Sequence, residues 1–332
     1  MAAGFKKATV RAADVPSTQT DFPSYVDLDR LGVITLAEAQ SIRVYADEAK
    51  TVEWAREIVS ATEMHVKVPS LTSTVEIFVD WDGVRADYAV GATYGRNEVW
   101  SDYESVFHMQ DASGSLTDAT GLAGLSVTGS PTFSVAGQID DGVDYNGTTA
   151  DHKKTTGGAN ATVPVTVQAW FNADNISSIN AIVFMGTGDS EHGLIIVSSQ
   201  LWALSEDGLN AQAQSGTLSS NTWYMGHGVF TSTTDRKVFV NGSLVGTNTT
   251  SKNITTGAGV SVATRFSTTS QHFDGTIDEV RVRKSALSAN WMTTEYNNQN
   301  AESTFWGTWT DAGGGGGGGA AQAARRGAVM MM

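Results

Sequence analysis

The stretch that decides the fold is residues 273–296, FDGTIDEVRVRKSALSANWMTTEY. Apolar side chains at Val280 and Val282 alternate with charged ones, which is the two-residue period of a β-strand with one buried face and a charged outer face. The charged residues are Glu279, Arg281 and Arg283. Because Ile277 is out of phase with the two valines, a bulge or twist is expected near Asp278.

A short helix is predicted directly after this strand. Ser288 is placed as its N-cap, because a serine hydroxyl accepts a hydrogen bond from a free backbone N–H of the first turn. Leu287 precedes the cap and Met292 follows it by four residues, which is the spacing of a hydrophobic staple. The stretch therefore predicts a strand, a turn and a capped helix in that order.

The sequences FDGTIDEVRV and ALSANW within this stretch resemble the last strand and closing turn of laminin-G-like, concanavalin A-type jelly-roll domains. Upstream, WY at 223–224, VF at 229–230 and KVFVNGSLV at 237–245 are similar to the central hairpin of that family. Asn241 and Gly242 form the strongest hairpin signal in the chain, since both turn positions favour positive φ. The resemblance implies a jelly roll whose usual role is binding carbohydrates or surfaces.

The composition sets limits on fold and function. A chain of 332 residues has room for two ordinary domains, and 35 glycines with only 17% charged residues favour short strands and tight turns over long helices. The net charge of −14 argues against binding to nucleic acid or anionic membranes, and no segment reaches membrane-spanning length. The absence of cysteine excludes disulfides, a thiol nucleophile and thiolate zinc sites.

The predicted fold class is all-β, with two β-sandwich domains, the second a concanavalin A-like jelly roll, and a flexible Gly-rich C-terminal tail. The expected divisions are an N-terminal arm, a first sandwich, a connection, the jelly roll, and a poly-Gly linker with a C-terminal peptide. Their bounds are 1–20, 21–110, 111–136, 137–310 and 311–332. We expect the segment NNQNAESTFWGTWTDA at 297–312 to run back beside the first domain, and residues 31–40 to form one helical turn.

Residues 20–110 resemble an uncharacterised bacterial β-sandwich family that often precedes a laminin-G-like domain. The matching segments are DFP at 21–23, IRV at 42–44, HVKVPSL at 65–71, IFV at 77–79, VW at 99–100 and VFHM at 106–109. Where relatives tend to have Tyr-Tyr-Gly-Asn, this chain has DWDG at 80–83. The family implies a fold and no activity.

The acidic residues do not form the catalytic pattern of concanavalin A-like glucanases, which carry carboxylates two and four residues apart on one strand face. Asp278 and Glu279 are adjacent, so their side chains are expected on opposite faces of the strand. The six histidines show no ligand spacing and are interpreted as surface or core residues. The chain is therefore predicted not to be an enzyme, with a glycoside hydrolase as the least favoured alternative.

Two groups of residues are candidates for binding. Calcium, the one cofactor considered, prefers oxygen ligands, and the alternative for these acids is solvated turn carboxylates. The calcium candidates are Asp140, Asp141 and Asp144. A sugar site needs an aromatic ring with amides and carboxylates beside it, and the alternative for the tryptophan is a core position. The sugar candidates are Asp189, Glu191, His192, Trp202, Asp207 and Asn210.

The C-terminal end is a linker of seven glycines, 313–319, followed by AAQAARRGAVMMM. One interpretation is a disordered terminus. The other is a tethered docking peptide that pairs with an acidic neighbour and fills an apolar groove on another subunit. The docking residues would be Arg325, Arg326, Val329, Met330, Met331 and Met332.

The N-terminus contains no apolar run of signal-peptide length. By analogy with phage structural proteins, we expect a virion surface protein, such as a capsid decoration, fibre or tail-associated component, that binds surface glycans. Its partners would be other virion proteins of the capsid or tail and glycans, and by the same analogy a homo-oligomer, as a trimer, is expected. The alternative is a bacterial extracellular or cell-surface adhesion protein that binds carbohydrate.

Overall fold

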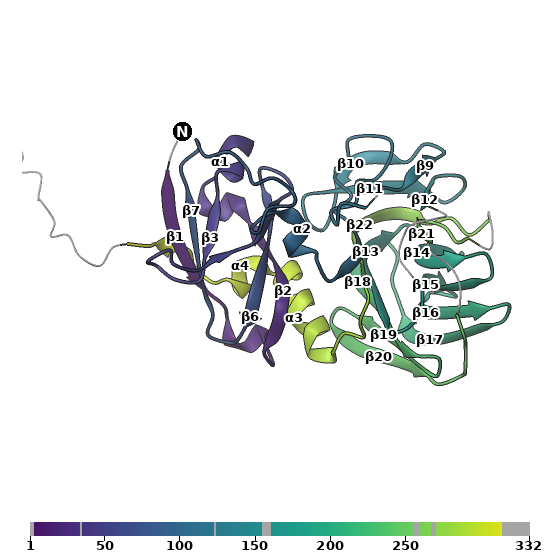
Figure 1. Ribbon diagram of the computed structural model, residues 1–332. Coiled ribbons are helices and arrows are strands. Elements are labelled where there is room, and N and C mark those ends of the chain that lie inside the picture. The colour runs from purple at the N-terminus through teal and green to yellow at the C-terminus, as the bar shows by residue number, and fades with distance from the viewer. Residues whose placement is uncertain are drawn as a thin grey trace, which may run out of the picture.

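The computed structural model describes residues 3–33, 35–122, 124–154, 161–254, 259–266 and 270–313. Two antiparallel β-sandwiches lie side by side (Figure 1). The all-β prediction with two sandwiches, the second a jelly roll, is confirmed. None of the helices in these ranges is long and apolar enough to cross a membrane.

The first sandwich consists of a five-stranded and a three-stranded sheet. The larger sheet has the order β23 (Thr310–Asp311), β1 (Gly4–Thr9), β7 (Glu76–Trp81), β3 (Arg43–Tyr45), β4 (Glu53–Trp54). The smaller sheet has the order β2 (Gln19–Asp27), β6 (Glu63–Leu71), β5 (Arg56–Ile58). Short helical segments accompany these strands: η1 (Ala12–Asp14), η2 (Leu28–Leu31), α1 (Leu36–Gln40) and α2 (Arg96–Val99).

The second sandwich consists of an eight-stranded and a seven-stranded sheet. The eight-stranded sheet has the order β10 (Thr132–Ala136), β11 (Asp141–Asn146), β22 (Asp274–Arg283), β13 (Val165–Ala173), β18 (Trp223–Ser232), β19 (Asp235–Val240), β20 (Ser243–Asn248), with β8 (Tyr103–Phe107) also paired to β22. The seven-stranded sheet has the order β17 (Asn210–Thr217), β16 (Gln200–Asp207), β15 (Ser190–Val197), β14 (Asn180–Thr187), β21 (Gly259–Val262), β12 (Asp151–Lys154), β9 (Ser126–Thr128).

The chain ends of the first sandwich differ from the expected divisions. Residues 4–9, expected within an arm, form β1 and pair along their whole length with β7, because this edge of the sheet offers free backbone groups. Strand β8, expected in the first sandwich, pairs with β22 of the second. The predicted return of the C-terminal segment is confirmed, since β23 pairs with β1.

Strand β22 has the predicted bulge. Its pairing with β13 changes register between Gln168 and Trp170, and Glu279 has a φ of +48° at that point. The prediction of a charged outer face open to solvent is wrong, because Glu279 is 0% exposed and Arg281 1% exposed. The first sandwich and helix α3 (Ala289–Asn300) cover this face, and its charges are satisfied by one another.

The helix after β22 follows the sequence prediction. The Ser288 hydroxyl accepts a hydrogen bond from the Trp291 backbone N–H at 3.1 Å, and Leu287 and Met292 pack in the same hydrophobic core. The hairpin between β19 and β20 has φ of 51° at Asn241 and 74° at Gly242, as predicted. Helix α3 contacts β2 of the first sandwich and β20 of the second, and lies between them in Figure 1.

The hydrophobic core of the first sandwich extends across the boundary. It includes Val229 and Phe239 from the second sandwich, as well as Trp306 from the segment after α4 (Glu302–Phe305). Trp306 is 0% exposed, and its indole N–H donates to the Tyr25 carbonyl at 3.2 Å. The two sandwiches therefore share a packed apolar interface in which buried charged groups also meet.

Candidate functional site

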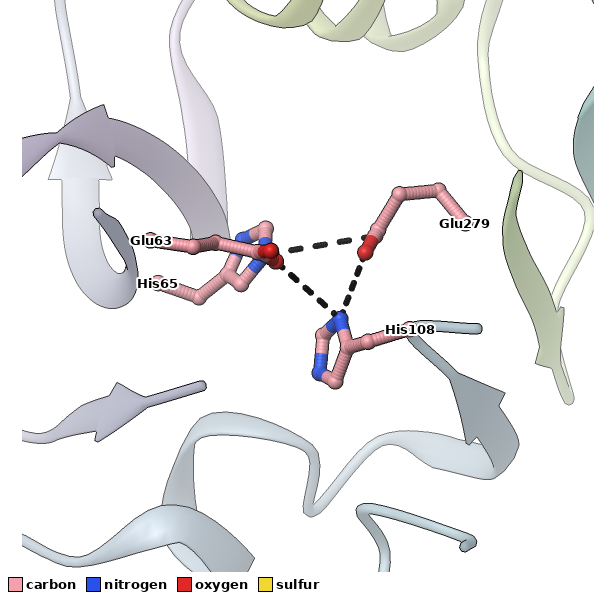
Figure 2. Close-up of side chains that lie close together, drawn as sticks. All are labelled: Glu63, His65, His108 and Glu279. Carbon is pink, nitrogen blue, oxygen red and sulfur yellow. Dashed lines mark hydrogen bonds and ion pairs between the residues drawn. The ribbon is translucent and has the colours of Figure 1, made fainter. Parts of the chain in front are cut away.

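Four buried side chains with nitrogen or carboxylate donors meet between the two sandwiches (Figure 2). They are Glu63, His65, His108 and Glu279, here called the four-residue cluster. One donor atom from each residue lies within 4.8 Å of the donor atoms of the other three. Within the described ranges, this is the group of such side chains close enough together to hold a metal ion.

The fold brings these residues together from distant parts of the chain. Glu63 and His65 are two residues apart on β6, so their side chains share one face of the strand. His108 directly follows β8, which pairs with β22 so that Phe107 lies opposite Val280. The bulge in β22 at Glu279 therefore lies next to His108.

The distances within the cluster form a closed ring. His65 Nε2 lies 2.7 Å from Glu63 Oε1, and His108 Nδ1 lies 2.6 Å from Glu279 Oε1. The two remaining sides are 3.4 Å between His108 Nδ1 and Glu63 Oε1, and 3.9 Å between His65 Nε2 and Glu279 Oε2. The imidazole rings of His65 and His108 stack with their centroids 4.9 Å apart.

Further polar groups surround the cluster. Arg281 contacts Glu279 Oε2 at 2.5 Å and reaches Glu295 Oε1 of α3 at 3.0 Å. His108 Nε2 lies 3.0 Å from Glu57 Oε2, which also accepts the indole N–H of Trp100. The Gln110 amide donates to the second carboxylate oxygen of Glu63. Glu63, His108 and Glu279 thus have polar partners outside the cluster, whereas Nδ1 of His65 has none among the described residues.

The buried setting shifts the pKa values of all four residues. Burial, followed by the nearby Glu279 carboxylate, raises the pKa of Glu63 well above its ordinary value, and burial holds the pKa of His65 well below its own. Burial alone would lower the pKa of His108, but the Glu279 and Glu57 carboxylates raise it well above its ordinary value. Burial opposes ionisation of Glu279, yet His108 and Arg281 hold its pKa well below its ordinary value.

A hollow of about 200 Å³ leads to one side of the cluster. Glu57, His108 and Gln110 line it together with Arg96 and Asp111. The side chains of Glu63, His65 and Glu279 are 0% exposed behind it. His108 is therefore the member of the cluster that lines the hollow, and there is no room beside the other three residues for a sugar.

Sequence reasoning missed the cluster, because it treated the histidines as surface or core residues. The burial part of that interpretation holds, since His65 is 0% and His108 7% exposed. The available signal was Glu63-Met64-His65, which places a carboxylate and an imidazole on one strand face. The partners 108 and 279 have no such local signal, because the sheet pairing alone brings them near.

The structure separates the predicted sugar-binding residues into two sets. Asp189, Asp207 and Asn210 are exposed on neighbouring turns, where the Gly208 N–H donates to the Asp189 carbonyl at 3.0 Å, and Trp202 on β16 is partly exposed. Two others are buried: Glu191 contacts Arg265 at 2.7 Å, and His192 Nδ1 lies 2.8 Å from the Ser205 hydroxyl. Their burial removes these two residues from the surface that a glycan would contact.

Trp202 and Asn210 line a hollow of about 190 Å³ on the seven-stranded sheet, here called the Trp202 hollow. Its other lining residues are Ile179, Ile195, Val197, Leu204, Arg265 and Gln271. A polar groove of about 570 Å³, here called the rim groove, adjoins it and shares Ile179 and Gln271. The rim groove is also lined by Asn146, Gly147, Thr148, Ser177, Ser178, Asn180, Ser270, His272 and Asp274.

The predicted calcium ligands contact different parts of the protein. Asp140 Oδ2 accepts hydrogen bonds from Ser60 and Thr62 of the first sandwich, each at 2.6 Å. Asp144 Oδ1 lies 3.4 Å from the Thr276 hydroxyl, and Asp141 begins strand β11. Calcium binding by these three residues stays a prediction. The docking residues, Arg325, Arg326, Val329, Met330, Met331 and Met332, lie outside the described residues.

Comparison with protein families gives one match. Residues 146–292 match the family model described as the concanavalin A-like lectin/glucanases superfamily. The match supports the resemblance inferred from the sequence over residues 146–292, which lie in the second sandwich and its following helix. No curated protein matches the chain at a significant level.

Several solved structures resemble the chain. Domain 4 of AbnA, a GH43 extracellular arabinanase from Geobacillus stearothermophilus, solved in complex with arabinotriose, is 18% identical, with a TM-score of 0.48, covering 58% of this chain and 97% of that domain. The receptor binding domain of botulinum neurotoxin C/D mosaic serotype is 12% identical, with a TM-score of 0.49, covering 60% of this chain and 52% of that one. The match thus spans about half of the toxin domain.

Proposed function

We propose that the chain is a non-enzymatic glycan-binding protein, and that the Trp202 hollow and the rim groove of its second sandwich together bind a sugar chain. The family match supports the general class, since it covers the strands that form both depressions. The observation that carries the proposal is the partly exposed indole of Trp202 in a hollow with the amides of Asn210 and Gln271.

The chemistry of the two depressions suits a sugar. An indole ring can pack against the apolar face of a pyranose, while amides, hydroxyls and carboxylates bind its hydroxyl groups. The rim groove supplies Thr148, Ser177 and Asp274 for such contacts. Its volume of about 570 Å³ lies within the roughly 300–1,000 Å³ of small-molecule sites, so several sugar residues fit along the groove and hollow.

The lining residues also support binding without hydrolysis. Glycoside hydrolysis uses two carboxylates that flank the scissile bond, roughly 5–10 Å apart. Among the residues that line the groove and the hollow, Asp274 is the one carboxylate. The adjacent acids Asp278 and Glu279 are both 0% exposed, and Asp278 accepts backbone N–H groups of residues 138 and 139.

A glycan array with the full chain tests the proposal, followed by affinity measurements on Trp202→Ala for each glycan that binds. Loss of a stacking aromatic is expected to weaken binding about 10- to 30-fold, equivalent to about 1.4 to 2 kcal/mol. Trp223→Ala is a matched control, because Trp223 is also partly exposed on the second sandwich but lies outside both depressions. Equal affinity of both variants, or no glycan bound by the wild type, contradicts the proposal.

We further propose that the protein is displayed on a virion, as a capsid decoration, fibre or tail-associated component, where it binds host-surface glycans as a homotrimer. The support is the analogy with phage structural proteins that carry such domains, together with the strongly acidic composition. Mass spectrometry of purified particles tests this placement. If the protein is absent from particles and is recovered from the surface of the producing bacteria, a bacterial adhesion protein is favoured instead.

A further inference from the structure

The four-residue cluster has the composition of a metal-ion site. It offers two imidazole nitrogens and two carboxylate oxygens, a set that zinc binds in proteins. Donor atoms at about 2.0–2.2 Å from a tetrahedral zinc ion lie roughly 3.4 Å from one another. Four donor pairs lie 2.6, 2.7, 3.4 and 3.9 Å apart, with Oε1 of Glu279 in the first and Oε2 in the last. One donor atom from each residue lies within 4.8 Å of the other three, so changes of up to about 1.5 Å in these separations would give tetrahedral positions.

We propose that the four-residue cluster binds one divalent metal ion of the zinc type, and that this ion joins the two sandwiches. Glu63 and His65 come from β6 of the first sandwich, Glu279 from β22 of the second, and His108 from the segment that connects them. Four protein donors complete the coordination of zinc, which is typical of a structural site. The inference goes beyond glycan binding and concerns a different part of the molecule.

The charges around the cluster favour an added cation. Four buried glutamates lie in one connected network, in which the basic side chain of Arg281 contacts Glu279 and Glu295, and that of His108 contacts Glu57 and Glu279. The glutamates are Glu57, Glu63, Glu279 and Glu295. Buried carboxylates are stable only when they are paired or bind a metal ion. A divalent ion between Glu63 and Glu279 would compensate the excess of acidic groups.

Outer contacts of the kind that orient metal ligands are present for Glu63, His108 and Glu279, whereas Nδ1 of His65 has no hydrogen-bond partner among the described residues. Metal-binding histidines commonly direct their second ring nitrogen at a carboxylate, and His108 Nε2 lies 3.0 Å from Glu57. Each carboxylate also has a partner for its Oε2 atom. Oε2 of Glu63 accepts a hydrogen bond from Gln110, and Oε2 of Glu279 accepts one from Arg281. The hollow of about 200 Å³ beside His108 gives an ion a route from solvent.

The test uses untagged, full-length protein that has been stripped with a chelator and dialysed. Titration with zinc chloride, read by calorimetry and by elemental analysis of the dialysed complex, is expected to give one ion per chain. Glu63→Gln preserves the shape of the side chain and its hydrogen bond with Gln110, but an amide is a poor zinc ligand. This variant is expected to bind zinc at least about 100-fold more weakly and to lose the rise in melting temperature that zinc causes in the wild type.

His192→Gln is the matched control, because His192 is also buried but contacts Ser205 and Phe230 away from the cluster. It is expected to bind zinc as the wild type does. If Glu63→Gln does not fold, X-ray absorption of the zinc-loaded wild type still decides, since two nitrogen and two oxygen neighbours are expected. Equal zinc binding by the wild type and Glu63→Gln overturns the proposal, as does a preference for magnesium over zinc.

Discussion

Replacing Arg281 with methionine should destabilise the folded chain strongly, because this side chain compensates two buried carboxylates. Arg281 is 1% exposed and contacts Glu279 at 2.5 Å and Glu295 at 3.0 Å, and its guanidinium lies 4.9 Å from the ring centroid of Trp100. Methionine fills much of the same volume, so the main loss is electrostatic.

The magnitude follows from the burial of both partners. Removing one partner of a buried ion pair costs about 3 to 5 kcal/mol, because the remaining charge is left without compensation. The carboxylates that remain, Glu279 and Glu295, are 0% and 1% exposed, so water cannot take the place of the guanidinium. With an m-value of about 3 kcal/mol/M in urea, the midpoint of unfolding would fall by about 1 to 1.7 M.

Urea unfolding of the full chain in the presence of a chelator, followed by tryptophan fluorescence, measures this effect. Arg283→Met is the control, since Arg283 lies two residues along the same strand but pairs at 2.8 Å with the half-exposed Asp102. The Arg283 side chain is 11% exposed, but its partner Asp102 is open to water, and a pair screened in this way contributes about 0 to 1 kcal/mol. A loss below about 1 kcal/mol for Arg281→Met, or equal losses for both variants, would refute the view that the buried network depends on Arg281.

Three further predictions concern the rest of the fold. Trp306→Ala should lower the free energy of unfolding in urea by about 3 to 5 kcal/mol, because it leaves a cavity in the core of the first sandwich. A loss below about 1 kcal/mol would show that this core does not need the C-terminal segment. Burial raises the pKa of Glu302 to about 7 despite its ion pair with Arg30, so the folded chain retains a proton there that the unfolded chain releases above about pH 4.5. Glu302 should therefore lower the free energy of unfolding by up to about 3 kcal/mol as pH rises from 4.5 to 7. Urea titrations across this range should show that Glu302→Gln removes the decline. An unchanged decline in the variant would contradict this role of Glu302. Gly242→Ala should destabilise the folded chain by about 1 kcal/mol or more in thermal unfolding. The φ of Gly242 is +74°, and an added Cβ would lie 3.0 Å from the nearest atoms of α3. An unchanged melting temperature would contradict this prediction.

Local patterns were sufficient to predict the central elements. The strand and helix of residues 273–296, the bulge near Asp278, the cap at Ser288 and the turn at Asn241 all depend on neighbours within a few residues. Such features follow from backbone sterics and short-range hydrogen bonds. The match of residues 146–292 to a known superfamily agrees with that interpretation.

The surroundings of those elements could not be predicted in the same way. Alternation along β22 showed that Glu279 and Arg281 face away from the sandwich core, but it contained nothing about what covers them. His108 and Glu279 are 171 positions apart in the chain and meet through the pairing of β8 with β22. Asp189 and Glu191 lie two residues apart in one short segment, and the sequence does not show that the turn ends between them, so exposed Asp189 could not be distinguished from buried Glu191.

The pairing of β23 with β1 bears on the order in which the protein can fold as it is synthesised. The first sandwich takes β1 from residues 4–9, but its edge strand β23 comes from residues 310–311 and part of its core from Phe305 and Trp306. These later residues leave the ribosome only after the whole second sandwich. Nascent domains commonly fold from the N-terminus onward. In this protein the second sandwich can fold before the first one is complete. Until β23 is synthesised and pairs with β1, the first sandwich has an unpaired strand edge at β1.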